Sequence, residues 1–268
     1  MAFWTYNGLK FGIKSVKFPR EKDFYDCFIS SINVDIKKCL NFGKISDKSE
    51  QRCKECELIC PTESISIAKL LSQKELSDIE GSKAIDAERC IFCGLCIDAC
   101  INANISTGGG AITYTNEFEF NIRKQNYAAE KIFKKSLFVK HIDTGSCGAC
   151  ESEINALNNP YYNMHRLGIF MTPSPRFADV LLATGVFTEK MTEVFFNVLD
   201  NIPKPRYIIL AGSCAITRGI YENKETASLS ANQLKILEAE NIIALPHCPP
   251  NPFEILNVLL LIKNGELK

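Results

Sequence analysis

The chain has 268 residues, 31 acidic and 31 basic side chains, and an apolar fraction of 46%. This length suits two domains, because a single domain usually holds about 100–150 residues. The balanced charge gives no indication of a nucleic-acid partner. The best apolar segment, residues 253–262, is about half the length that a membrane-spanning helix needs, so we expect no span.

Residues 1–25 are predicted to form a docking arm. Aromatic side chains at Phe3, Trp4 and Tyr6 are followed by basic ones between Lys10 and Arg20, and the first 20 residues include no acidic one. Such a segment suits a membrane surface or a groove on a partner, and an extended arm packed over its own domain is the alternative. The segment lacks an export signal and a twin arginine, which predicts a cytoplasmic protein.

Cysteine is the dominant feature of residues 26–110. The chain contains 13 cysteines and only 3 histidines. In a reducing cytoplasm, clustered cysteines are more often metal ligands than disulfides. Two crowded runs stand out, Cys53-x2-Cys56-x3-Cys60-Pro61 and Cys90-x2-Cys93-x2-Cys96-x3-Cys100.

The spacing within these runs is typical of iron–sulfur ligands. Three thiolates at every third residue can hold one cluster, while the fourth cysteine, commonly followed by proline, crosses to the other cluster. Cys90, Cys93 and Cys96 fit this pattern, with Cys60 as the crossing ligand of the same cluster.

The ligands of the other cluster are less regular, because Glu50 stands three residues before Cys53. A loop insertion would move the missing ligand upstream to Cys39. This cluster is then predicted to be held by Cys39, Cys53, Cys56 and Cys100. The alternatives are Cys27 in place of Cys39, a three-iron cluster held by three thiolates, or a zinc site.

A short β-prone segment follows each run, at residues 64–67 and 104–106, so this region reads as an internal repeat. The glycines at 108–110 accompany no phosphate-binding pattern and are predicted to form a flexible turn. Residues 111–135 are expected to be a linker. The segment from Cys39 to Cys100 resembles bacterial two-cluster ferredoxins and the ferredoxin-like subunit of complex I, which implies two [4Fe–4S] clusters.

Residues 136–268 have an α/β pattern. Strands are predicted at 138–142, 178–182, 207–210 and 242–245, and helices at 151–157, 189–199, 231–240 and 253–262. This alternation predicts a flavodoxin-like, doubly wound parallel sheet. Cys147, Cys214 and Cys248 each follow a strand, in loops that such a sheet gathers at the carboxyl ends of its strands.

The motifs here resemble a second family. Gly145-Ser146-Cys147-Gly148-Ala149-Cys150-Glu151, Pro173-Ser174-Pro175-Arg176, Gly212-Ser213-Cys214 and Cys248-Pro249-Pro250-Asn251-Pro252 occur in the order found in small subunits of [NiFe]-hydrogenases and in the homologous 20 kDa-type subunit of complex I. Complex I typically has adjacent cysteines, so the spacing of Cys147 and Cys150 favours the hydrogenase type. The resemblance implies a third, proximal [4Fe–4S] cluster on Cys147, Cys150, Cys214 and Cys248.

Some residues near these cysteines depart from the family pattern or suggest further roles. Arg218 and His247 stand where the family usually has glycine. The resemblance implies no catalytic residue in this chain, but it suggests Glu151 and Glu153 as a proton relay to a partner active site. A solvated helix face is the alternative for both glutamates.

Taken together, the two halves resemble the small electron-transfer subunit of a membrane-bound group 4 [NiFe]-hydrogenase, of the formate-hydrogenlyase or energy-converting type. The resemblance implies an oxidoreductase complex with a [NiFe] large subunit, integral membrane subunits, and ferredoxin or formate dehydrogenase as electron donor. This chain lacks the paired CxxC motifs that hold nickel. Its expected place is peripheral, on the cytoplasmic face of the inner membrane. The alternatives are a complex I-like quinone or cofactor oxidoreductase, a free electron carrier, or an iron–sulfur sensor.

Overall fold

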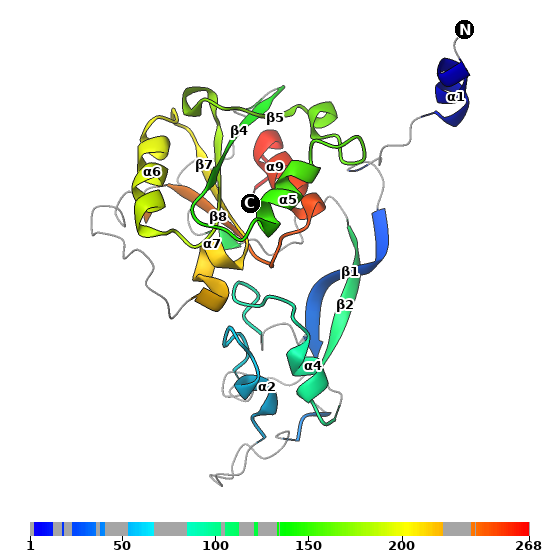
Figure 1. Ribbon diagram of the computed structural model, residues 1–268, viewed down its shortest axis with the longest axis vertical. Helices are drawn as coiled ribbons and strands as arrows, with labels where there is room; N and C mark the ends of the chain where they lie inside the picture. The colour runs from blue at the N-terminus through cyan, green and yellow to red at the C-terminus, as the bar shows by residue number, and fades with distance from the viewer. Residues whose placement is uncertain are drawn as a thin grey trace.

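The structure is a computed structural model with an α/β body and a smaller cysteine-rich body beside it (Figure 1). It describes residues 3–12, 18, 23–35, 38–40, 53–66, 85–102, 105–112, 121–122, 133, 135–221, 237–238 and 240–267.

The α/β body is built on a six-stranded sheet in the order β3-β8-β7-β6-β4-β5. The strands are β3 (Asn121–Ile122), β4 (Leu137–Asp143), β5 (Ile169–Met171), β6 (Val180–Thr184), β7 (Tyr207–Ala211) and β8 (Asn241–Leu245). Five of them are parallel, and β3 adds an antiparallel edge next to β8. Numbered along the chain, the parallel strands follow the order 2-1-3-4-5, which is the flavodoxin-like order. The predicted fold class is confirmed.

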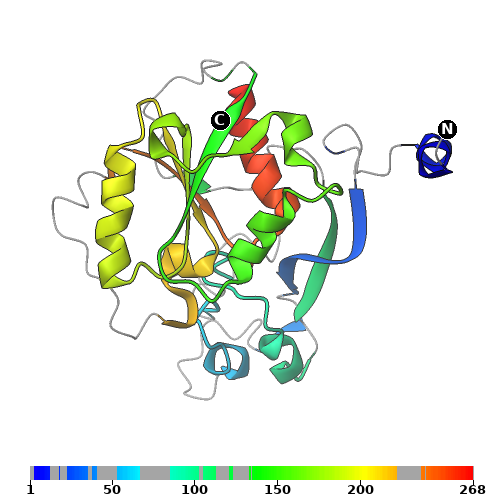
Figure 2. The ribbon, with the colours of Figure 1, turned by 45° about the horizontal axis from the view of Figure 1, so that its top comes forward.

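Helices cover both faces of this sheet (Figure 2). Val180 and Leu182 of β6 face a core that contains α5 (Ala149–Ala156) and α9 (Pro252–Asn264), whereas Leu181 and Ala183 face α6 (Glu189–Asp200). This alternation explains why β6 is buried along its whole length. Helix α9 is buried from Pro252 to Ile262, which agrees with a sequence that is apolar there except at Glu254 and Asn257.

Short helical turns complete this body. They are η3 (Met164–Leu167), η4 (Pro175–Phe177), α7 (Ser213–Thr217) and η5 (Gly219–Tyr221). The strand β5 and the helix α7 lie outside the predicted elements, because three to five residues are too few to show a clear period. Of the helix predicted at 231–240, only residues 237, 238 and 240 are described, and the rest lies outside the described residues.

The cysteine-rich body contains an antiparallel pair, β1 (Asp23–Val34) and β2 (Ile105–Ile112), and two short helices, α2 (Glu55–Leu58) and α4 (Leu95–Ala99). An isolated antiparallel bridge joins Ile65 to Ile85. The small core consists of a few aliphatic side chains and of the cysteines themselves. Cysteine ligation would therefore add to the stability of a body that has little apolar core of its own.

The prediction of a flexible turn at the three glycines was wrong. Gly108, Gly109 and Gly110 lie within β2, and Gly108 and Gly109 pair with Ser31 and Ile29 of β1. The pairing has register shifts between Phe24 and Ser31, and glycine readily fits such irregular strands. Local propensity favours a turn here, but the partner strand supplies backbone hydrogen bonds that the sequence alone does not show.

The first residues divide into two parts with different surroundings. Helix α1 (Phe3–Phe11) has no buried residue and lies apart from both bodies in Figures 1 and 2. Phe18, in contrast, is 1% exposed, and its ring centroid lies 5.3 Å from that of Phe253 in α9. Arg166 donates a hydrogen bond to the carbonyl oxygen of Phe18. Phe18 therefore anchors the end of the segment that α1 begins.

Candidate iron–sulfur sites

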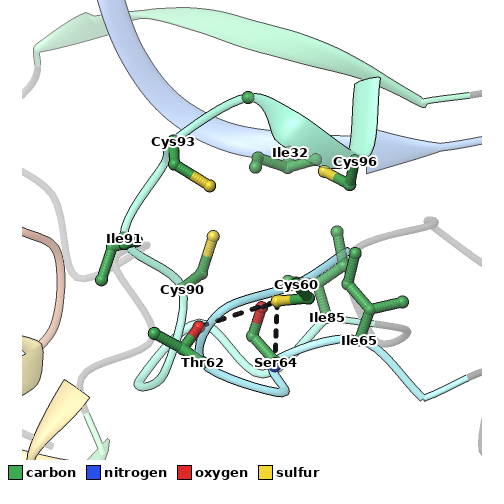
Figure 3. A pocket seen from close by; sticks show the side chains of 11 residues that line it. Ile32, Cys60, Thr62, Ser64, Ile65, Ile85, Cys90, Ile91, Cys93 and Cys96 are labelled. Atoms are coloured by element: carbon green, nitrogen blue, oxygen red, sulfur yellow. Dashed lines mark hydrogen bonds between the residues drawn. The ribbon is translucent and has the colours of Figure 1, made fainter. Parts of the chain in front are cut away.

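Four cysteines from both runs surround one recess, which we call the second cysteine site. Cys60, Cys90, Cys93 and Cys96 line it, and their sulfur atoms face a shared space (Figure 3). Cys90, Cys93 and Cys96 come from the second run, and Cys60 crosses over from the first. The structure therefore brings together the four residues that the spacing predicts for one cluster.

The second cysteine site is also contacted by Ser64 and Thr62, which lie outside the predicted ligand set. The backbone N–H of Ser64 donates to Cys60 Sγ at 3.3 Å, and the hydroxyls of Ser64 and Thr62 lie 3.1 and 3.7 Å from the same sulfur. Burial raises the pKa of the Cys60 thiol, but these hydrogen bonds outweigh burial and bring the pKa below its usual value. The Cys60-Pro61 pair is the sequence signal for these contacts, because a turn there brings the next residues back toward the Cys60 sulfur.

A second recess, the first cysteine site, is lined by Cys39, Cys53, Cys56 and Cys100. The structure thus places Cys39 with the other three residues of the predicted set. The alternative ligand, Cys27, is in β1, and its side chain lies outside the described residues. The pKa of Cys56 is raised to about 11, first by burial and then by the neighbouring Cys39, Cys100 and Cys53.

The third cysteine site lies at the carboxyl edge of the parallel sheet. Cys147 and Cys150 follow β4, Cys214 follows β7, and Cys248 follows β8. The pKa of Cys150 is raised to about 12, first by burial and then by the nearby Glu151, Cys248 and Cys147. A hydrogen bond links Cys214 and Cys248; this bond raises the pKa of Cys214 and lowers that of Cys248 to about 7. Residues about 100 positions apart therefore meet at one place.

Close backbone approach makes the third cysteine site possible. Gly212 has a φ of +92°, and a Cβ at this position would lie 2.7 Å from Cys150 Sγ. The loops after β4 and β6 also touch, because a Cβ on Gly185 would lie 2.6 Å from the backbone of Gly145. These loops flank the point where the strand order reverses, which is where doubly wound sheets bind their ligands.

The donor chemistry of the three sites fits iron–sulfur clusters. Four thiolates are the usual ligand set of a [4Fe–4S] cluster, and each site offers four cysteines. Within the described part of the chain, no group of three or more His, Cys, Asp or Glu side chains converges as the ligands of a single metal ion would. Neighbouring thiols oppose one another's ionisation, and a bound cluster of cationic irons would relieve that repulsion.

The two glutamates proposed as a proton relay have different surroundings. Glu151 accepts hydrogen bonds from the hydroxyls of Ser146, at 2.6 Å, and Thr184. Burial raises the pKa of Glu151, but these two bonds outweigh burial and lower it. Burial raises the pKa of Glu153. Glu151 is thus held as an acceptor beside Cys150, while Glu153 holds its proton more strongly than an exposed glutamate does.

The second and third cysteine sites belong to loops that touch each other. The hydroxyl of Ser213 donates to the carbonyl oxygen of Cys90 at 3.2 Å. The hydroxyl of Thr217, one helical turn further, donates to the carbonyl oxygen of Glu88. Figure 1 shows α7, which carries Ser213 and Cys214, at the side of the α/β body nearest the cysteine-rich body. Nothing in the spacing of the cysteines indicates this contact.

The fold and these sites define an iron–sulfur protein in which a two-site module adjoins a flavodoxin-like domain with a further cysteine site. Residues 51–104 match the 4Fe-4S dicluster domain family, and residues 147–262 match the family "NADH ubiquinone oxidoreductase, 20 Kd subunit". The chain is 33% identical over 131 residues to a probable membrane-bound hydrogenase subunit of Pyrococcus furiosus, covering 49% of this chain and 76% of that protein. It therefore belongs to the family of the NADH ubiquinone oxidoreductase 20 kDa subunit.

Two further proteins are similar to this chain. Formate hydrogenlyase subunit 7 of Escherichia coli is 34% identical over 122 residues, which cover 46% of each protein. Among solved structures, an archaeal membrane-bound sulfane sulfur reductase aligns with 50% of this chain and 73% of its own, at 30% identity and a TM-score of 0.40.

Proposed function

We propose that this chain is the iron–sulfur electron-transfer subunit of a membrane-bound [NiFe]-hydrogenase complex. It would relay electrons between a low-potential donor and a large subunit that carries nickel and iron. The relatives named as hydrogenase and formate hydrogenlyase subunits support this assignment. The CxxC spacing of Cys147 and Cys150 favours it over the complex I-like oxidoreductase, which stays the second candidate.

The observation that carries the proposal is the continuity of the three cysteine sites. Each cysteine run contributes one residue to the site that the other run mainly forms, because Cys60 lines the second site and Cys100 lines the first. Cys56 and Cys60 therefore belong to neighbouring sites, and so do Cys96 and Cys100. The second site then touches the third through Cys90 and Ser213. When loaded, the three clusters would supply one-electron redox chemistry, and this chain would hold them in a fixed order.

The remaining residues would position the clusters and set their surroundings. Each would be a [4Fe–4S] cluster, on Cys39, Cys53, Cys56 and Cys100, on Cys60, Cys90, Cys93 and Cys96, and on Cys147, Cys150, Cys214 and Cys248. Ser64 and Thr62 donate toward Cys60, and hydrogen bonds to ligand sulfurs favour the more negative, reduced state of a cluster. Glu151 or Glu153 would serve proton transfer to the partner active site.

The chain would act at the cytoplasmic face of the inner membrane, together with integral membrane subunits. No helix in the described ranges has the length and apolarity to cross a membrane. The exposed aromatic helix α1 supports docking on a membrane subunit, because Phe3, Trp4 and Leu9 are largely exposed to solvent. Ferredoxin or formate dehydrogenase would be the electron donor.

Purification of the native complex through a tag on this chain tests the proposal. We expect about twelve irons per chain, as three four-cysteine clusters require, together with nickel on a co-purifying large subunit and hydrogen evolution from a low-potential donor. The variants Cys39→Ser and Cys248→Ser should each weaken one cluster and leave the other two. Iron without nickel or hydrogen would favour the complex I-like candidate instead.

A further inference from the structure

Two aromatic side chains meet where the cysteine-rich body touches the α/β body. Phe92 lies between Cys90 and Cys93 of the second cysteine site, and His247 directly precedes Cys248 of the third. Their ring centroids are 4.6 Å apart in an edge-on arrangement. The pair thus joins the ligand loops of two sites that lie in different bodies.

Both residues hold an unusual backbone conformation. Phe92 has a φ of +52° and His247 a φ of +86°, in the left-handed region that side chains other than glycine rarely adopt. Such residues persist only where their surroundings fix them, and they concentrate at functional sites. Because the two strained residues contact each other, their interaction contributes to holding both loops in place.

Further bonds close this junction on the side of the α/β body. His247 Nδ1 lies 2.9 Å from Glu254 Oε2, and the Glu254 side chain is 2% exposed. The backbone N–H of Ser213 donates to the carbonyl oxygen of His247, while the Ser213 hydroxyl donates to that of Cys90. Ser213 therefore connects the loops that carry Cys90, Cys214 and Cys248.

We propose that Phe92 and His247 are positioning residues through which the second and third cysteine sites set each other's redox properties. The inference rests on the proposed function and adds specific residues to it. His247 is 9% exposed, and its contact with Phe92 would keep water out of the space between the two ligand loops. Reduction adds negative charge to a cluster, and water admitted to this space would stabilise that charge and raise the reduction potential. A change on one side of the junction should therefore be measurable on the other.

Redox titration of the full, cluster-loaded chain, followed by electron paramagnetic resonance, tests the proposal with two conservative variants. Phe92→Leu keeps an apolar side chain but removes the ring. His247→Asn keeps an amide donor for Glu254 and suits a positive φ, but it also removes the ring. The signal of the third site is assigned by its loss in Cys248→Ser, and that of the second site by its loss in Cys60→Ser.

We expect Phe92→Leu to raise the midpoint potential of the third site and His247→Asn to raise that of the second. The oxidised-to-reduced ratio at fixed potential should fall by at least about threefold, which is roughly 28 mV for a one-electron couple. The control is His165→Asn, since His165 makes a similar ring contact with Phe170, with centroids 5.3 Å apart, away from the cysteine loops. It should leave both potentials unchanged.

The proposal is overturned if each variant shifts only the site in its own loop, or if His165→Asn shifts both potentials equally. Should one variant lose its own cluster, the other still tests the junction from the opposite side. A failure of the proposed function looks different, because the unmodified chain would then lack three separate cluster signals. Unchanged potentials across the junction, with all three signals present, refute only the role of Phe92 and His247.

Discussion

Hydrogen bonds distinguish the individual cysteines of the three sites. Cys60 is contacted by a backbone N–H and by two hydroxyls, which lower the pKa of its thiol, whereas Cys96 is dominated by burial and by nearby cysteines, which raise its pKa to about 11. Groups that stabilise negative charge on sulfur also stabilise a reduced cluster. Single side chains such as Ser64 therefore give the second site its particular electrostatic surroundings.

A buried ion pair stabilises the α/β body at a distance from the cysteines. The guanidinium of Arg206 donates to both oxygens of Glu240, at 2.6 and 3.1 Å, and also to the carbonyl oxygens of Leu199 and Ile202. Burial raises the pKa of Glu240, but Arg206 and then Lys204 outweigh it and hold the pKa below its usual value. The charge on Glu240 is thus favoured in the folded state.

Replacing Glu240 with Gln should reduce the free energy of unfolding at pH 7 by about 3 kcal/mol, because Arg206 would stay buried without its counter-charge. The folded-state pKa of Glu240 is lowered, so its contribution is present above the unfolded pKa and is lost as the pH falls through the folded one. The difference from the unmodified chain, measured by urea unfolding and circular dichroism, should therefore stay constant from pH 7 down to about pH 5 and shrink as the pH falls below 4.5, the usual pKa of a glutamate. Glu193→Gln, on the exposed side of α6, is the control; an equal loss in both variants would contradict the prediction.

The third cysteine site depends on the loops that follow the parallel strands. Gly212 and Gly148 both have a φ near +90°, but only Gly212 lies against a cysteine sulfur. Arg218 and His247 also adopt a positive φ, of +70° and +86°. Glycine is the residue best suited to that backbone, and the hydrogenase small-subunit family that this chain resembles usually has glycine at these two positions.

Gly212→Ala should remove the cluster of the third site while the other two stay, because its Cβ would lie 2.7 Å from Cys150 Sγ. Iron analysis should then fall from about twelve to about eight atoms per chain, with one paramagnetic signal missing. Gly148→Ala also places a side chain at a positive φ, +88°, but its ψ of −9° is better tolerated than the ψ of 149° at Gly212, and no atom lies within 4 Å of the added Cβ. If both variants lose the same iron, backbone strain rather than the contact with Cys150 would be the cause.

Several elements follow from local pattern, and others do not. The apolar strands β6, β7 and β8 and the helices α6 and α9 are within a few residues of their predicted ranges, since each carries a clear periodic or continuous apolar signal. The three glycines of β2 mislead because their own preference is for a turn. Their strand exists through pairing with β1, about 80 residues earlier in the chain.

The helix proposed to dock on a partner lies away from the sites proposed to carry electrons. Helix α1 exposes Phe3, Trp4 and Leu9 by 80%, 77% and 71%, away from the cysteine sites. Phe18 ties the segment to the α/β core beside α9. Shortening the chain must stop before Phe18 if the core is to stay intact.

Deleting residues 1–12 should release the chain from the membrane fraction without loss of iron, because α1 buries no side chain against either body. Cell fractionation followed by iron analysis of the released chain measures both properties. A control variant, Val194→Ser on the exposed face of α6, should stay with the membranes. If the shortened chain remains bound, attachment through a partner on another face would explain it, and α1 would have no docking role.

Cysteine spacing predicted iron–sulfur ligation, and the alternation of strands and helices predicted the fold class that the structure has. Cysteine spacing is a local property, so it indicated clusters and the exchange of Cys60 and Cys100 between the two runs. The folded chain was needed to show that Cys39 lies with Cys53, and that Phe92 meets His247 across 155 positions of sequence. No regular spacing links Cys39 to Cys53, and the second contact depends on how the cysteine-rich body packs against the α/β body, which no local periodicity records.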